Sequence, residues 1–263
     1  MASQLTLLWR LVTTVRNWPV YFLNRFGKME GKTEVRFHLW NGMTIIGRPF
    51  SIDRAIINEE WLDCCYDPNY FGVPWDWSAC RNVVDIGSHI GTFTLYAAAH
   101  AKNARIAAVE PEPSNVEVLR KNIAVNKLEN RVTVYPAAMA DRDGTMTLHV
   151  TYDKSASGGH SLYDYTGTGK AVEIPTLSLQ TLFTKQGIEK CEFLKIDCEG
   201  AEYAMLFSAP DELLKKVRFL ALEVHHFSKE PNHTPQAMKL FLENRGFTVM
   251  SPAKSLLFAW RTA

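Results

Sequence analysis

Two apolar runs, each followed by a carboxylate, constrain the fold of this chain more than any other feature. In residues 82–85 two valines precede Asp85; a glycine-bearing turn follows, and then an apolar helix from Thr92. Residues 105–110 hold the second run, which ends at Glu110. A buried strand, a tight turn, a helix and another buried strand form the repeating unit of a parallel α/β sheet. We therefore predict a core built around such a sheet.

The alternation of strand and helix continues to the end of the chain. Further strands are predicted at residues 131–137, 193–197 and 219–225, and helices at 114–126, 179–186, 201–207 and 235–245. Ser114 is expected to cap its helix in a capping box with Glu117, and Gly246 to end the last helix. Residues 247–250 and 256–260 are spaced closely enough to pair antiparallel. The predicted fold class is α/β, with a doubly wound, mostly parallel sheet.

Residues 1–79 precede this domain as an extension. Apolar residues at helical spacing in 5–26 predict an amphipathic helix, and Asn41-Gly42 predicts a hairpin between strands 34–39 and 43–47. Residues 53–66 are predicted to form a helix with its aromatic residues facing inward. The main domain, 80–263, contains an insertion at about 145–175, which we interpret as a lid or substrate-binding loop.

Composition narrows the class of partner and the compartment. The 29 basic and 28 acidic residues give no electrostatic reason to expect nucleic acid as a partner. The five cysteines lack metal or disulfide spacing, which indicates reduced thiols in the cytoplasm. No apolar stretch is long enough to cross a membrane. The helix at 5–26 is expected to pack on the domain or a partner chain; the alternative is contact with a membrane surface through residues such as Trp9 and Trp18.

The turn after the first strand resembles a nucleoside site. Dinucleotide folds use G-x-G-x-x-G, whereas this chain has Asp85-x-Gly87-x-x-x-Gly91, the pattern of S-adenosylmethionine (SAM) methyltransferases. Glu110 lies 23 positions beyond Gly87, close to the separation of about 20 expected for an acid that binds ribose hydroxyls. Gly87 is expected to let backbone amides approach the methionine end of the cofactor, and Asp85 either to orient its ammonium group or to stabilise the turn.

Four successive strands end in acidic residues. The tips read Asp85-Ile-Gly87, Glu110, Asp197-Cys-Glu199-Gly200 and Glu223-Val-His225. Ligands of parallel α/β sheets gather at the carboxyl ends of the strands, so these residues are expected to share one site.

These strings resemble the FkbM family of SAM-dependent methyltransferases. The resemblance covers roughly residues 80–250, and its most specific part is the run from Phe193 to Glu202, which contains Lys-x-Asp-x-Glu-Gly-x-Glu. It implies a Rossmann-like class I methyltransferase fold with a seven-stranded sheet, SAM as cofactor, and O-methylation of a hydroxyl on a small molecule, sugar or glycan. Ser88-His89 stand where the family usually has Ala-Asn. Ala137-Ala138 stand where many class I enzymes place an adenine-binding acid, and Asp141 is close enough to substitute.

The predicted cofactor contacts follow from the turn and this resemblance. They are Asp85, Gly87, Ser88, His89, Gly91, Glu110, Ala138 and Asp141.

Catalysis of O-methylation requires in-line positioning and a base for the hydroxyl proton. His225 is the first candidate for the base, because the unperturbed pKa of histidine lies near neutrality. Asp197 is the second candidate, and Glu223 shares a strand face with His225. Lys195 is expected to pair with a strand-end acid.

A second mechanism would use a divalent cation held by some of Asp197, Glu199, Glu223 and His225. We prefer the metal-free mechanism, because Glu199 is expected to point away from Asp197 if it lies in a helical turn.

Two other functions compete with this interpretation. A non-catalytic SAM-binding or scaffold protein would keep the cofactor turn, and an NAD-dependent oxidoreductase would share the fold but would need the missing G-x-G-x-x-G. The sequence does not indicate an oligomeric state.

Overall fold

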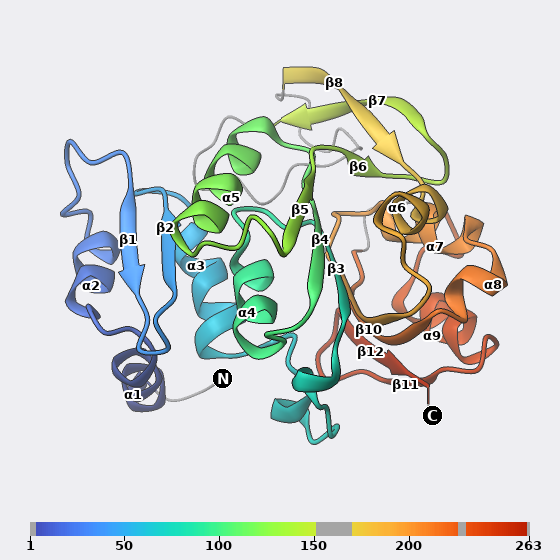
Figure 1. The fold of residues 1–263 in the computed structure, drawn as a ribbon, viewed down its shortest axis with the longest axis horizontal. Helices are drawn as coiled ribbons and strands as arrows, with labels where there is room; N and C mark the ends of the chain where they lie inside the picture. The colour runs from blue at the N-terminus through green and yellow to red at the C-terminus, as the bar shows by residue number, and fades with distance from the viewer. Residues whose placement is uncertain (1–3, 151–169, 226–229, 262–263) are drawn as a thin grey trace.

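A seven-stranded sheet forms the centre of the protein (Figure 1). The computed structural model describes residues 4–150, 170–225 and 230–261. The strand order is β11-β12-β10-β9-β3-β4-β5. The strands are β3 (Asn82–Ile86), β4 (Arg105–Val109), β5 (Val132–Tyr135), β9 (Cys191–Ile196), β10 (Val217–Glu223), β11 (Thr248–Met250) and β12 (Leu256–Trp260).

The pairing confirms the predicted doubly wound, mostly parallel sheet. The five strands from β5 to β10 are parallel, and β12 joins antiparallel to β10 and pairs antiparallel with β11. The chain builds outward from β3 through β4 to β5, and then returns to build outward from β9 on the other side of β3. The strand order therefore reverses between β3 and β9, and the crevice at such a switch point is where ligands bind.

Helices cover both faces of this sheet. On one face lie α4 (Thr92–His100) and α5 (Pro113–Val125); on the other lie α6 (Leu179–Gln186), α7 (Glu202–Ser208) and α9 (Pro235–Glu243). The two buried clusters show this division, because Phe93 and Phe193 belong to one and Leu182 and Leu194 to the other. A short helix that the sequence did not predict, α8 (Asp211–Leu214), follows α7.

The start of α5 differs from the prediction. Glu112, not Ser114, is the N-cap residue, and its Oε2 accepts a hydrogen bond from the Asn115 amide at 2.6 Å. The Ser114 hydroxyl donates to the same oxygen at 2.6 Å. Pro113 explains the shift, because proline is favoured at the first helical position, where it has no amide hydrogen to leave unpaired.

The N-terminal segment forms two helices where one was predicted. They are α1 (Gln4–Thr14) and α2 (Pro19–Arg25), and Pro19 begins the second. Between them Val15 pairs with Leu39 of the neighbouring hairpin. That hairpin, β1 (Val35–His38) and β2 (Thr44–Gly47), confirms the prediction, with Gly42 of its turn at φ 92°.

The predicted helix at 53–66 is shorter and changes its winding. It consists of α3 (Asp53–Ile57) and a π-helical turn η1 (Asn58–Leu62), and the 3₁₀ turns η2 (Pro68–Phe71) and η3 (Trp77–Ala79) follow. The aromatic residues face inward as predicted: Trp61 is buried and its Nε1 donates to the Thr92 carbonyl at 3.0 Å.

The extension packs on the α4 face of the sheet. Leu11 of α1 and Trp61 of η1 share a buried cluster with Phe93, and Arg10 pairs with Asp63 at 2.8 Å. The first helix therefore packs within the extension, against η1, and its contact with the domain or a partner chain stays a prediction. Trp9 is 66% exposed on the opposite side of α1, so the membrane-surface alternative stays a prediction.

The insertion begins and ends in a small separate sheet of order β6-β8-β7. Its strands are β6 (Ala138–Met139), β7 (Gly144–Val150) and β8 (Lys170–Leu177). The polar loop predicted as a lid lies in residues 151–169, outside the described residues. Across the described ranges, no helix has the length and apolarity needed to span a membrane.

Candidate functional site

A cavity of about 830 Å³ lies beside the carboxyl ends of β3, β4 and β9. Seven residues predicted from the sequence line it: Gly87, His89, Glu110, Ala138, Lys195, Asp197 and Glu199. The extension adds Ile56, Glu59, Glu60 and Tyr66. The strand tips therefore converge on one site as predicted, and residues outside the main domain complete its wall.

Glu110 is held in place by protein donors. Its Oε2 accepts from the His89 amide at 2.9 Å, and its Oε1 accepts from the Glu112 amide at 3.0 Å and from Asn115 Nδ2 at 3.1 Å. Burial raises the pKa of Glu110 to about 7, although these donors oppose the shift. A carboxylate fixed in this way at the edge of a cavity retains acceptor capacity for ribose hydroxyls.

Gly87 is required for a reason other than the one predicted. Its amide and that of Ser88 both donate to the Val109 carbonyl at 3.0 Å, so neither is directed at a ligand. A Cβ atom at Gly87 would lie 1.6 Å from the carbonyl oxygen of Asp197. The glycine therefore allows the tip of β9 to touch the cofactor turn.

Three predicted contacts are structural and do not line the cavity. Asp85 is fully buried and accepts from the Thr94 hydroxyl at 2.6 Å, which fixes α4 to β3. The Ser88 hydroxyl donates to the Asp85 carbonyl at 2.9 Å. Gly91 adopts φ 88°, and a Cβ there would meet Leu119 at 2.4 Å. For Asp85, the geometry supports the alternative of stabilising the turn.

His89 connects the cofactor turn to the extension. Its Nε2 lies 3.3 Å from Arg48 Nη2 and 3.6 Å from Asp53 Oδ1. Arg48 also donates to Asn115 Oδ1 at 2.8 Å, and Asn115 in turn donates to Glu110. Burial opposes ionisation of Asp53, but its bonds with Arg48 hold the pKa of Asp53 below its usual value. His89, which stands where the family usually has Asn, thus contacts Arg48 and Asp53 of the extension.

The side of the cavity expected to bind adenine is apolar. Ala137, Ala138 and Met139 line it. Asp141 does not: its side chain is 45% exposed and lies 3.9 Å from Arg142. The expectation that Asp141 replaces the missing adenine-binding acid thus gains no support from this geometry and stays a prediction.

Lys195 pairs with a strand-end acid as predicted. Its Nζ lies 3.4 Å from Asp85 Oδ1 and 3.8 Å from Asp197 Oδ2, and it donates to the Gly87 carbonyl at 2.8 Å. Burial disfavours its charge, but the surrounding carboxylates outweigh that penalty and raise the pKa of Lys195. The lysine carries a permanent charge between the cofactor turn and Asp197.

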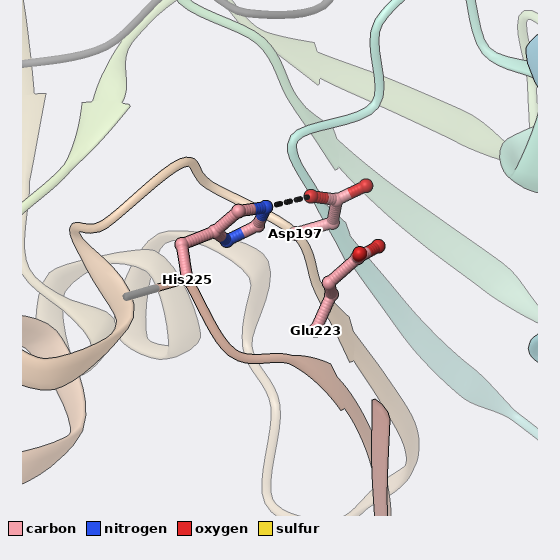
Figure 2. Close-up of side chains that lie close together, drawn as sticks. All are labelled: Asp197, Glu223 and His225. Carbon is pink, nitrogen blue, oxygen red and sulfur yellow. Dashed lines mark ion pairs between the residues drawn. The ribbon is translucent and has the colours of Figure 1, made fainter. Parts of the chain in front are cut away.

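Asp197, Glu223 and His225 come together at the tips of β9 and β10 (Figure 2). His225 Nε2 lies 3.7 Å from Asp197 Oδ1. The Tyr66 hydroxyl lies 3.1 Å from Asp197 Oδ2 and 3.2 Å from Glu223 Oε2. Burial and the Asp197 charge raise the pKa of Glu223. Asp197 lines the cavity, whereas Glu223 and His225 contact the group from outside the residues that line it.

His225 is surrounded by acids. The Glu202 carboxylate accepts from the His225 amide at 2.6 Å and lies 3.4 Å from Nδ1. Burial opposes protonation, but Glu202, Asp197 and Glu199 outweigh it and raise the pKa of His225 to about 9. The ring therefore holds a proton at neutral pH, which counts against the first candidate for the base.

Glu199 does not point away from Asp197 as expected. Its carboxylate lies 3.6 Å from His225 Nε2, the nitrogen that also faces Asp197. The physical reason is the backbone: Glu199 adopts φ 51° and Gly200 φ 100°, so the chain leaves the helical path before α7 begins. Burial raises the pKa of Glu199 to about 7.

Sequence reasoning missed four acidic or phenolic residues of the site: Glu59, Glu60, Tyr66 and Glu202. Glu202 lies in the first turn of α7, where an acid is common without any role in a site. The sequence signal for Glu60 is the pair of adjacent acids, Glu59 and Glu60, in a segment whose aromatic residues face inward. The π-helical turn places Glu60 in the interior. Burial there raises the pKa of Glu60 to about 8.

Comparisons with known proteins find similar methyltransferases. The model of the methyltransferase FkbM domain matches residues 85–249. The methyltransferase sdnD of Sordaria araneosa is 29% identical over 224 residues, covering 74% of this chain and 82% of that protein. The 31-O-demethyl-FK506 methyltransferase FkbM of Streptomyces tacrolimicus is 25% identical over 194 residues, covering 64% and 73%.

A solved structure of methyltransferase FkbM from Methylobacillus flagellatus KT is also similar. The two share 16% identity and superimpose over 93% of this chain with a TM-score of 0.45. The chain spans 59% of the length of that structure.

Proposed function

Because the chain belongs to the FkbM family of methyltransferases, we propose that it is a SAM-dependent enzyme that methylates a hydroxyl oxygen of a small molecule, sugar or glycan. Membership of this family sets aside the NAD-dependent oxidoreductase, whose glycine pattern the chain also lacks. The observation that supports O-methylation is the position of Asp197. Its carboxylate opens on the same cavity as Glu110, and its backbone touches the cofactor turn at Gly87.

The residues of the cavity fit SAM. Glu110 offers acceptor oxygens for the ribose hydroxyls, and Ala138 and Met139 offer an apolar wall for the adenine ring. Glu59 and Glu60 add carboxyl oxygens to the wall, which can accept from or face the positive charge of a sulfonium. When bound, SAM supplies an activated methyl group, so the protein has to position the acceptor and take up its proton.

We assign the proton acceptor to Asp197, the second candidate from the sequence. It is the member of the Asp197–Glu223–His225 group that lines the cavity, so it can reach a hydroxyl there. Tyr66 and Lys195 fix Asp197 from two sides, and His225 faces it from behind. In this arrangement His225 is a positioning residue, and the proton of the hydroxyl passes to the carboxylate of Asp197.

Ligand binding and methyl transfer test the proposal separately. SAM and S-adenosylhomocysteine should raise the melting temperature of the protein, whereas NAD should leave it unchanged. Incubation of fractionated cell extract with labelled SAM should then yield a labelled ether. Binding of SAM with no labelled product in any fraction would favour the non-catalytic SAM-binding protein, and label on nitrogen would contradict O-methylation.

A further inference from the structure

We propose that Asp197, Glu223 and His225 form a binding site for one divalent cation of the first transition row, with Mn²⁺ as the best match. The inference deepens the proposed function, on which its catalytic role rests, because the ion would hold the acceptor hydroxyl oxygen beside Asp197. The binding itself is a property of these residues alone and can be tested without cofactor or acceptor.

The geometry of the three side chains allows a single ion to contact all of them. One ligand atom from each lies within 4.8 Å of the others, and Figure 2 shows the carboxylates and the ring converging from adjacent strand ends. Two carboxylates suit hard cations and one imidazole suits transition metals, so Mn²⁺ accepts the whole set. The three residues are half-buried, which leaves coordination positions open to water or an acceptor.

His225 is oriented in the way that metal-binding histidines are. Its Nδ1 lies 3.4 Å from the fully buried carboxylate of Glu202, and its Nε2 faces Asp197. A carboxylate behind one ring nitrogen fixes the ring and directs the other nitrogen to the metal. Glu202 also accepts from the amides of Gly200 and His225, so it ties the tip of β10 to the start of α7.

The charge of the site favours a cation. The Tyr66 hydroxyl is within hydrogen-bond distance of both Asp197 and Glu223, but one hydroxyl has one proton and cannot donate to both at once. Glu199 adds a third carboxylate that faces His225. A divalent ion among these groups, bound by the neutral ring of His225, would offset a repulsion that Lys195 only partly balances.

An independent observation comes from Glu60 in the wall of the same cavity. Its side chain is buried, with 7% of the residue exposed, and among the described residues its Oε2 has no hydrogen-bond partner. An unpartnered carboxylate oxygen in the interior is costly, and it indicates that the cavity is built to receive positive charge or a donor.

The test is titration of Mn²⁺ into the full chain after chelator treatment, without cofactor, followed by calorimetry and by loss of the free-ion electron paramagnetic resonance signal. We expect one site per chain. Asp197→Asn, Glu223→Gln and Glu202→Gln should each weaken Mn²⁺ binding by about 10- to 100-fold. These substitutions keep side-chain size, and circular dichroism would confirm that each variant is folded.

Two matched controls identify the site. Glu110→Gln removes a carboxylate from the same cavity and Glu212→Gln one from the exposed surface; both should bind Mn²⁺ like the parent protein. Absence of binding in the parent protein, or equal affinity in all variants, would overturn the inference. Binding of S-adenosylhomocysteine is measured separately, in excess chelator. If S-adenosylhomocysteine binds there but the titration without chelator detects no Mn²⁺ binding, the cation site is wrong and the proposed methyltransferase stands. If transfer is undiminished after exhaustive chelation, the catalytic role of the ion is wrong.

Discussion

The two ends of the cavity satisfy their carboxylates in opposite ways. At the nucleoside end Glu110 accepts three hydrogen bonds, two of them from backbone amides. At the other end, where we propose that the acceptor binds, Asp197 and Glu223 both lie within hydrogen-bond distance of the Tyr66 hydroxyl. The Glu199 carboxylate faces His225 at this same end. The hydrogen bonds of Glu110 are therefore formed before any ligand binds. The carboxylates of Asp197, Glu223 and Glu199 instead need a ligand, a proton or an ion to balance their charge.

The difference indicates two kinds of binding. Backbone amides are placed by the fold and cannot rotate away, so Glu110 presents a fixed surface to a cofactor used in every turnover. Neighbouring side-chain carboxylates can change their orientation and protonation when a ligand binds, which suits an acceptor that binds and dissociates in each reaction. The following substitutions should separate the two ends.

The largest effect is expected at Asp197. Asp197→Asn keeps the shape of the side chain but removes the proton acceptor, so methyl transfer should fall by about 10²- to 10⁴-fold. Affinity for S-adenosylhomocysteine, measured by calorimetry, should change less than about twofold, because the nucleoside end is intact. Equal losses of binding and transfer would show that the two ends are not independent.

Gly87 lies where the two ends meet, and its substitution should be the most destabilising to the fold. Gly87→Ala forces a Cβ to within 1.6 Å of the Asp197 carbonyl, so we expect a loss of more than about 4 kcal/mol in the free energy of unfolding. Gly72→Ala is the matched control: Gly72 has a similar φ of 76°, but a Cβ there would meet no atom of the described residues within 4 Å beyond its chain neighbours. Its cost should be about 1–2 kcal/mol. Urea unfolding measures both, and similar losses would mean that backbone conformation, not contact with β9, is what requires glycine.

Glu110→Gln should weaken the nucleoside end specifically. Loss of a charged hydrogen-bond acceptor predicts a rise in the dissociation constant of S-adenosylhomocysteine of about 10- to 100-fold, equivalent to about 1.5–3 kcal/mol. Asp141→Asn provides the control, because Asp141 lies outside the cavity and is expected to leave the affinity unchanged. A weaker complex in Asp141→Asn would support the adenine role predicted for Asp141.

Glu60 gives a smaller, pH-dependent effect. Its pKa is about 8 in the folded protein against 4.5 for an exposed glutamate, so between these values the folded state binds more protons than the unfolded state. Stability should therefore fall as the pH rises through this interval, with a slope of at most ~1.4 kcal/mol per pH unit from this group. Glu60→Gln removes the dependence. Between pH 5.5 and pH 8 the variant should gain about 1–2 kcal/mol relative to the parent protein in urea unfolding; parallel curves would show that Glu60 is satisfied at both pH values.

The sequence predicted the sheet and the convergence of its strand tips well, because both depend on local patterns. Apolar runs that end in acids mark parallel strands, and the tips of neighbouring strands must meet. The antiparallel pair at 248–260 follows from such patterns, and Lys195 pairs with a strand-end acid as expected.

What the sequence could not predict depends on backbone detail or distant contacts. The left-handed conformation of Glu199 turns its carboxylate toward His225. Glutamate rarely adopts this conformation, so the sequence does not predict it. The Tyr66 contact joins residues 131 positions apart. The N-cap at Glu112 was missed because Ser114 is the stronger cap by type, whereas Pro113 sets the register of the helix.

The hydrogen bonds that run from Arg48 through Asn115 to Glu110 have a consequence for how the chain can be divided. The matched family domain begins at residue 85, so a truncation designed on that boundary would discard Arg48 and Asp53 and leave His89 and Asn115 without these partners. Such a truncation would also remove residues 82–84 of β3 and the buried residues that the extension packs against α4, so the fragment is expected to lose its sheet together with its affinity for the nucleoside. Residues before the matched domain therefore help to hold Glu110 at the cavity wall.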